Sequence, residues 1–206
     1  MKKQLLFLAL MFSLVLTAQT AEQQKILAES QAFMELYDKK DYNKILEMSH
    51  PALLEKFDKQ VLLSAFKTIF EGNEEFSIGI DKVAKDAYNI SDIYTDGSTK
   101  YAFVDYPMSM SMVFKGKPLD EDTKKMMVSM MEAQGMKATF TDAQTVNIKK
   151  HAMMVAINDA STKNQWKYVN HDANSPMYTM IVPKEIIKKA NSYYGDLLLK
   201  DQDHAN

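Results

Sequence analysis

The stretch that decides the fold runs from residue 75 to residue 114 and reads EFSIGIDKVAKDAYNISDIYTDGSTKYAFVDYPMSMSMVF. Apolar and polar residues alternate over 76–80 and again over 108–114, and this period of two is typical of a strand with one buried face. Asp96-Gly97 lies between two further strand-like segments and is a preferred turn of a β-hairpin. We therefore predict an antiparallel sheet in which strands over 88–94 and 100–105 meet at this turn.

The sequence before this stretch has a helical period instead. Apolar residues recur at spacings of three and four from about residue 22 to 39, and again up to residue 71. Asp41 and Asp58 are suited to cap a second and a third helix, while Pro51 fits the first turn of a short helix between them. Gly72 is expected to end the third helix. Helices thus precede the sheet.

After the stretch, Asp120 predicts the start of a helix over about 119–134, which Gly135 ends. Strands are expected at 138–140, 146–150, 152–157 and 165–170, and a short last helix follows Pro183. No repeat or linker interrupts residues 22–206. We predict one α+β domain, with N-terminal helices packed on a curved antiparallel sheet.

The first 21 residues predict a secretory signal peptide. Lys2 and Lys3 precede an apolar run over 5–16, and small or polar residues follow it. The run is shorter than the ~20 apolar residues that span a bilayer. Cleavage is expected after Ala18 or Ala21, so the mature chain should be secreted or periplasmic, without stable membrane insertion.

Composition narrows the classes of function. The chain has no cysteine, which excludes disulfides, thiol nucleophiles and Cys-based metal sites. All 25 basic residues are lysine, and none of the basic runs exceeds two residues. Arginine is the preferred residue for bidentate binding of phosphate, so a nucleic-acid partner is not expected. The six glycines form no phosphate-binding loop, and we expect no cofactor.

Three segments resemble the NTF2-like (cystatin-like, cone-shaped) α+β superfamily: AFMELYDKKDYNKILEM at 32–48, LLSAFKTIFEGNEEFSI at 62–78 and NQWKYVNHD at 164–172. The resemblance is one of element order over most of residues 22–172. It implies a curved sheet that wraps the helices and leaves a cone-shaped cavity, which the family uses for small molecules, enzyme sites or protein contacts. The helix at 119–134 would be an insertion.

Methionine is the compositional outlier, with ten of the 16 between residues 108 and 154. One set, at positions 108, 110 and 112, lies on one face of a predicted strand. The other set, at positions 126, 127, 130 and 131, forms a stripe on the following helix. The pattern allows a thioether site for Cu(I) or Ag(I), an adaptable apolar groove, or simple packing of the helix on the strand. We expect the helix stripe to pack on the strand and to leave a groove. The candidate ligand-binding residues are Tyr106, Met108, Met110, Met112, Met126, Met127, Met130 and Met131.

The GxSxG nucleophile motif is absent, and the histidines do not have metal-ligand spacing. The resemblance nevertheless implies an enzyme as one alternative, with Asp105 or His151 as base and Tyr101 or Tyr106 nearby. That alternative requires such a group in a cavity within hydrogen-bond reach of a tyrosine. The leading hypothesis is an exported, non-catalytic protein that binds an apolar small molecule or a partner segment.

Overall fold

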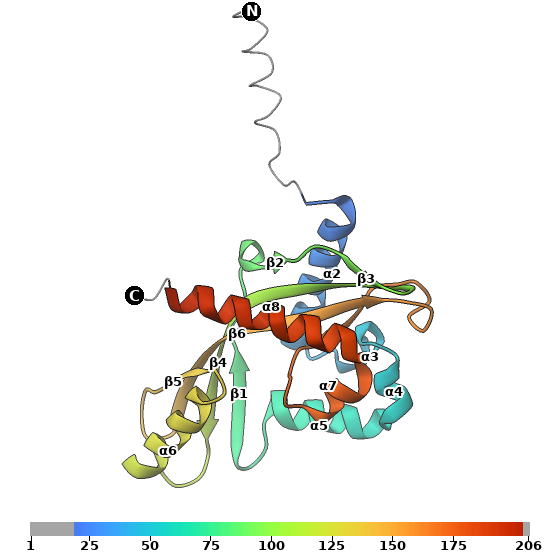
Figure 1. The fold of residues 1–206 in the computed structure, drawn as a ribbon. Helices are drawn as coiled ribbons and strands as arrows, with labels where there is room; N and C mark the ends of the chain where they lie inside the picture. The colour runs from blue at the N-terminus through green and yellow to red at the C-terminus, as the bar shows by residue number, and fades with distance from the viewer. Residues whose placement is uncertain (1–18, 204–206) are drawn as a thin grey trace, which may run out of the picture.

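A computed structural model describes residues 19–203 of the chain (Figure 1). Residues 1–18, which hold nearly all of the predicted signal peptide, lie outside this range. The α+β class is confirmed, since helices come first and an antiparallel sheet follows. Within residues 19–203, no helix is both long enough and apolar enough to cross a bilayer.

The helices are α2 (Ala21–Asp38), α3 (Tyr42–Met48), α4 (Ala52–Lys56), α5 (Lys59–Glu71), α6 (Glu121–Glu132), α7 (Pro176–Ile181) and α8 (Lys184–Asp203), with a 3-10 turn η1 (Lys85–Ala87). The strands are β1 (Phe76–Ile80), β2 (Asn89–Ile90), β3 (Tyr94–Asp96), β4 (Thr99–Phe114), β5 (Lys137–Phe140), β6 (Thr145–Asn158) and β7 (Lys167–Asn170). They form one sheet of order β1-β4-β6-β5, to which β2 and β3 add on β4 and β7 adds on β6.

Local capping chemistry explains where the N-terminal helices begin and end. Asp41 accepts a hydrogen bond from the Lys44 N–H, and Asp58 accepts one from the Gln60 N–H at 2.8 Å. Gly72 follows α5 with φ 80°, and a Cβ there would lie 2.6 Å from the Phe76 carbonyl oxygen. These contacts confirm the predicted caps. The sequence could predict them because each cap depends only on neighbouring residues.

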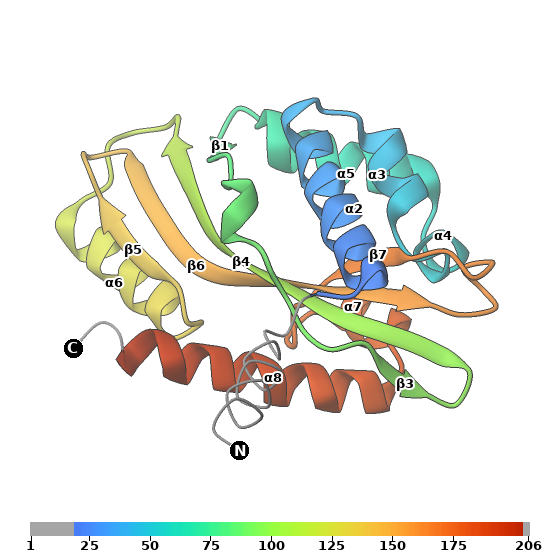
Figure 2. The same ribbon diagram turned by 90° about the horizontal axis from the view of Figure 1, so that it is seen from above.

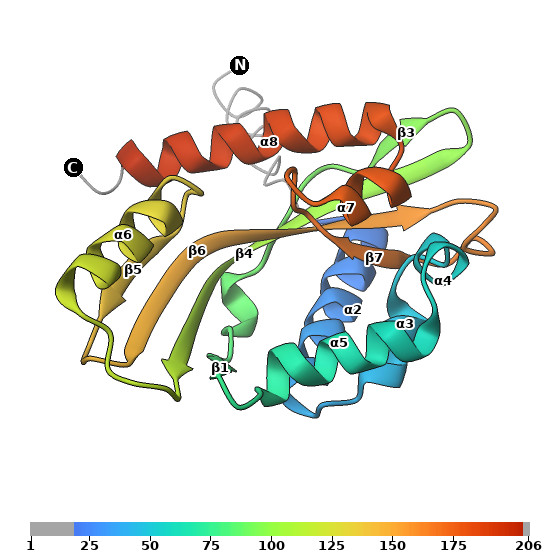
Figure 3. The same ribbon diagram turned by 90° about the horizontal axis from the view of Figure 1, so that it is seen from below.

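The sheet is curved and covered on both faces (Figures 2 and 3). Helices α2, α3 and α5 pack on the concave face, which bears the buried side chains of Ala102, Val104 and Tyr106. Helices α7 and α8 pack on the opposite face, against Tyr101 and Phe103. Alternate residues of β4 therefore enter different cores, as the period of two requires.

The structure joins two predicted strands into one. Segments 100–105 and 108–114 form the single strand β4, which runs through Pro107. The neighbouring backbone N–H groups of Ser91 and Asp81 reach β4 at the Phe103 and Ser109 carbonyls, on either side of this proline. Between Asp81 and Ser91 the chain leaves the sheet, so no strand pairs with β4 at Pro107 on this side. The missing N–H of proline therefore costs the sheet no hydrogen bond.

Two further predictions need correction. The predicted strand at 88–94 is split into β2 and β3, because the Ser91 hydroxyl accepts from the Phe103 N–H in place of a strand carbonyl. The predicted short last helix is the 20-residue α8, preceded by the unpredicted α7. The buried or half-buried stripe of α8 continues from Ile186 through Ala190 to Tyr193, and its packing stabilises the helix beyond the expected end.

Candidate functional site

A cavity of about 280 Å³ lies between α2, α5 and the concave face of the sheet. Most of its wall is apolar or thioether and comes from Met34, Ile69, Phe70, Ile78, Ile80, Tyr106, Met108, Met110, Ala152 and Met153. Its polar wall consists of Tyr37, Lys150, Asn170, His171 and Asp172. The cavity lies on the concave side of the sheet, and its lining is mainly apolar. Both features suit a small apolar ligand. We call this space the cone cavity.

The structure divides the predicted ligand-binding residues into three groups. Tyr106, Met108 and Met110 line the cone cavity. Met112 and Met131 lie instead in a separate apolar cluster with the buried Val146 and Ile148, to which Met110 also contributes. Met126 and Met130 are 58% and 57% exposed, and Met127 is half-buried.

The prediction that the whole methionine stripe of α6 packs on β4 is therefore wrong. Helix α6 lies beside the short edge strand β5, away from the N-terminal helices (Figure 1). Only one side of the helix meets the sheet there, through Val128 and Met131. A stripe at spacings of three and four is wider than this contact, so Met126 and Met130 face solvent.

A second, smaller chamber of about 180 Å³ adjoins the cone cavity. Both spaces are lined by Tyr37, Asn170 and Asp172. The Asn170 side-chain amide donates to the Tyr37 hydroxyl at 3.5 Å, and the Tyr37 ring contacts Phe70 at a centroid distance of 4.8 Å. Burial raises the pKa of Tyr37 to about 12, so it stays a neutral phenol. Tyr37 thus forms part of the wall between the two spaces.

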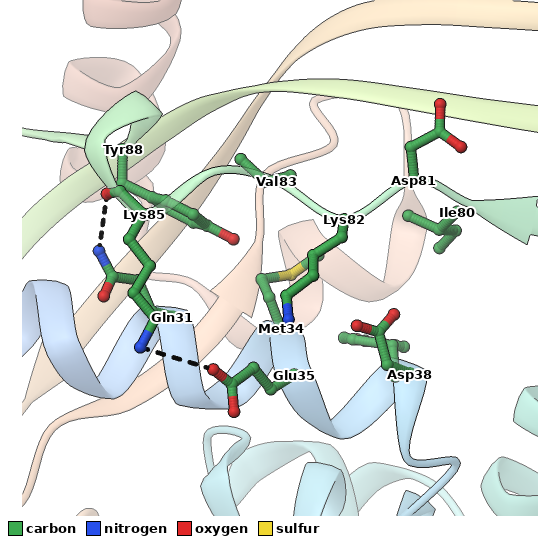
Figure 4. A pocket seen from close by; sticks show the side chains of 11 residues that line it. Gln31, Met34, Glu35, Asp38, Ile80, Asp81, Lys82, Val83, Lys85 and Tyr88 are labelled. Carbon is green, nitrogen blue, oxygen red and sulfur yellow. Dashed lines mark hydrogen bonds and ion pairs between the residues drawn. The ribbon is translucent and has the colours of Figure 1, made fainter.

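A much smaller space of about 30 Å³ lies between α2 and the segment that joins β1 to β2 (Figure 4). The Gln31 amide donates to the Lys85 carbonyl at 3.0 Å, and the Lys85 ammonium pairs with Glu35 at 3.8 Å. A space of this size holds about one water molecule. These contacts fasten the connecting segment to α2, and we do not regard the space as a ligand site.

The most polar buried group lies on the other face of the sheet. Asp105 is 0% exposed. Its carboxylate accepts hydrogen bonds from His151 Nε2 at 2.8 Å, from Tyr193 Oη at 2.9 Å and from Asn89 Nδ2 at 3.2 Å. Burial alone would raise the pKa of Asp105, but the three hydrogen bonds outweigh it and lower the pKa below the usual value.

This cluster brings Asp105 and His151 together with a tyrosine in hydrogen-bond reach, as the enzyme alternative requires. The tyrosine is Tyr193 of α8, however, and not the expected Tyr101 or Tyr106. Tyr106 points to the opposite face, where its hydroxyl lies 3.3 Å from the Met34 sulfur. The His151 side chain is 14% exposed and lines an open hollow of about 1040 Å³ beside the C-terminal half of α8.

Sequence reasoning missed Tyr193 and Tyr194 as partners of this cluster. The Tyr194 hydroxyl donates to the His151 carbonyl at 2.7 Å, so adjacent tyrosines of α8 both bond at this site. The available signal was the Tyr-Tyr pair that follows Ile186 and Ala190 at helical spacing.

Comparisons of the chain with protein-family models, with curated proteins and with solved structures give no significant match. Within residues 19–203, no three His, Asp or Glu side chains converge in a way that could hold a metal ion.

Proposed function

We propose that this protein is an exported, non-catalytic binding protein of the NTF2-like kind, which holds an apolar small molecule in the cone cavity. The observation that carries the proposal is the cavity itself: about 280 Å³, mainly apolar, and set between helices and a curved sheet. Methionine side chains are flexible and polarizable, so Met34, Met108 and Met110 suit a ligand of variable shape. Export rests on the N-terminal sequence.

Native mass spectrometry of the protein purified from its own host tests for a retained ligand. We expect an added mass of a few hundred daltons that is lost on denaturation. A captured peptide would favour a partner segment as the occupant instead, and a bound copper or silver ion would favour the thioether alternative.

A pair of variants on α5 tests the location. Ile69 lines the cavity and is 41% exposed, so Ile69→Trp can place its ring in the cavity mouth without disrupting the core. Val61 lies on the same helix, is 63% exposed and lies outside the cavity. With decanol as probe, we expect Ile69→Trp to weaken binding at least about tenfold and Val61→Trp to leave it unchanged. Equal binding by both variants would place the ligand elsewhere.

Acid–base catalysis at the Asp105–His151 pair is the second candidate, because a buried carboxylate that orients a partly exposed imidazole is an arrangement that enzymes use. The pair has a structural explanation as well, since it binds the two tyrosines of α8. An esterase and ketone-isomerisation screen, with His151→Gln as control, separates the two. Turnover that disappears in His151→Gln would support catalysis over simple binding.

A further inference from the structure

Among the residues that the structure describes, Lys150 is the one cation in the wall of the cone cavity. It lies on β6 directly opposite Met108, between Ile148 and Ala152 on alternate positions of the same sheet face. Those neighbours are buried in the apolar cores of that face, so Lys150 leaves the sheet among apolar side chains, and it lines both the cone cavity and the open hollow of about 1040 Å³.

The Lys150 ammonium has no partner among the side chains that the structure describes: no carboxylate lies within 4.0 Å and no hydrogen bond is formed. Burial lowers its pKa, and the field of Asp172 only partly offsets this effect. Asp172 is exposed, and its Oδ1 already accepts from the Asn174 N–H at 3.1 Å. A partly desolvated charge without a partner costs free energy, and an anion in the cavity would recover it.

The other polar residues of the cavity do not supply a competing positive charge. Burial lowers the pKa of His171, so its imidazole is neutral at pH 7. Its Nε2 lies 3.0 Å from the Asn191 side-chain oxygen and is already engaged. One positive charge in an otherwise apolar wall is complementary to a ligand with one negative end and an apolar body.

We propose that the ligand of the cone cavity is a single-chain amphiphile whose carboxylate binds Lys150 and whose apolar chain lies against Met108, Met110 and Phe70. This inference rests on the proposed function and adds the chemical class of the ligand. The volume of about 280 Å³ lies at the lower end of the usual ~300–1,000 Å³ for ligand pockets, which favours one medium-length chain over a two-chain lipid.

The test compares two probes that share a chain and differ in the head group, decanoate and decanol, by isothermal titration calorimetry on the mature protein. We expect decanoate to bind at least about tenfold more tightly than decanol, because a charge-assisted hydrogen bond adds to the same apolar contacts. In Lys150→Met, decanoate should fall to the affinity of decanol, while decanol binding stays the same. Lys67→Met, an exposed lysine on α5, is the matched control and should change neither affinity.

The outcomes separate the two proposals. Equal affinities for both probes, or a decanoate preference that survives in Lys150→Met, would overturn the role of Lys150 and leave the cavity proposal in place. No binding of either probe by the wild-type protein would contradict the cavity proposal itself. Lys150→Gln, with circular dichroism to verify the fold, repeats the test if the methionine variant does not fold.

Discussion

At the scale of single residues, Asp105 fastens α8 to the sheet. Its carboxylate receives bonds from β6, from β2 and from α8, so removing its charge weakens three contacts at once. The free energy of unfolding of Asp105→Asn at pH 7 should be lower by about 1–3 kcal/mol. Urea unfolding measures this. Asp92→Asn, which changes an exposed carboxylate between β2 and β3, should stay within about 0.5 kcal/mol of wild type.

The same variant predicts a pH dependence. The folded-state pKa of Asp105 is below its unfolded value of about 3.9, so the unfolded chain binds the proton more tightly. The stability that the carboxylate contributes is fully present above that unfolded value and is lost as pH falls through the folded pKa. The gap between wild type and Asp105→Asn should therefore shrink below about pH 4. A gap that stayed constant down to pH 2 would contradict the role of the charge.

At the scale of the elements, the N-terminus of α2 depends on a capping box. The Thr20 hydroxyl accepts from the Gln23 N–H at 3.1 Å, and the Gln23 side chain accepts from the Thr20 N–H at 2.8 Å. A cut after Ala18 would keep this box, and a cut after Ala21 would remove it. A chain that begins at Gln19 should be more stable by about 1 kcal/mol than one that begins at Glu22. Thermal unfolding of both chains tests this, and equal stability would show that the box contributes nothing.

The elements also show how far sequence reasoning reaches. Helix starts at Asp41, Asp58 and Asp120 were predictable, because a cap is a contact between residues two or three apart. The meeting of Asp105 with His151 was not, since it depends on the register that places Asp105 opposite Met153. An alternating pattern fixes which face a residue takes but not which residue lies across from it. The contact of Tyr193 with Asp105 was even less predictable, because it requires α8 to cross the sheet.

The methionine stripe of α6 also shows that local spacing predicts an element but not its tertiary contacts. Its spacing correctly predicted a helix, but the extent of the surface that the helix covers depends on the width of the sheet beside it. Because β5 is only four residues long, Met126 and Met130 lie beyond its cover. The cone cavity could be anticipated in outline from the element order, whereas its cation, Lys150, could not, since lysines on strands usually face solvent.

At the scale of the whole molecule, the two faces of one sheet carry different tasks. The face under α8 is closed by hydrogen bonds to Asp105 and His151. The concave face is left incompletely filled by the cone cavity of about 280 Å³, and the chamber of about 180 Å³ adjoins it at β7, where α7 also lines it. Tyr37 lies between them, in contact with Phe33 and Phe70, and its hydroxyl accepts from Asn170. On the proposed function, this ring sets the length of chain that the protein accepts.

Removing the Tyr37 ring should therefore change ligand preference as well as stability. Tyr37→Ala is expected to cost about 2–4 kcal/mol of unfolding free energy and to join the two spaces. Hexadecanoate, which is too long for the cone cavity alone, should then gain affinity relative to decanoate by about tenfold or more. Tyr37→Phe keeps the ring and should keep the wild-type ratio, while Tyr37→Leu offers a milder opening if the alanine variant unfolds. An unchanged ratio in a folded Tyr37→Ala would mean that the second chamber does not extend the first, because a longer chain gains affinity only where it finds new apolar surface to cover.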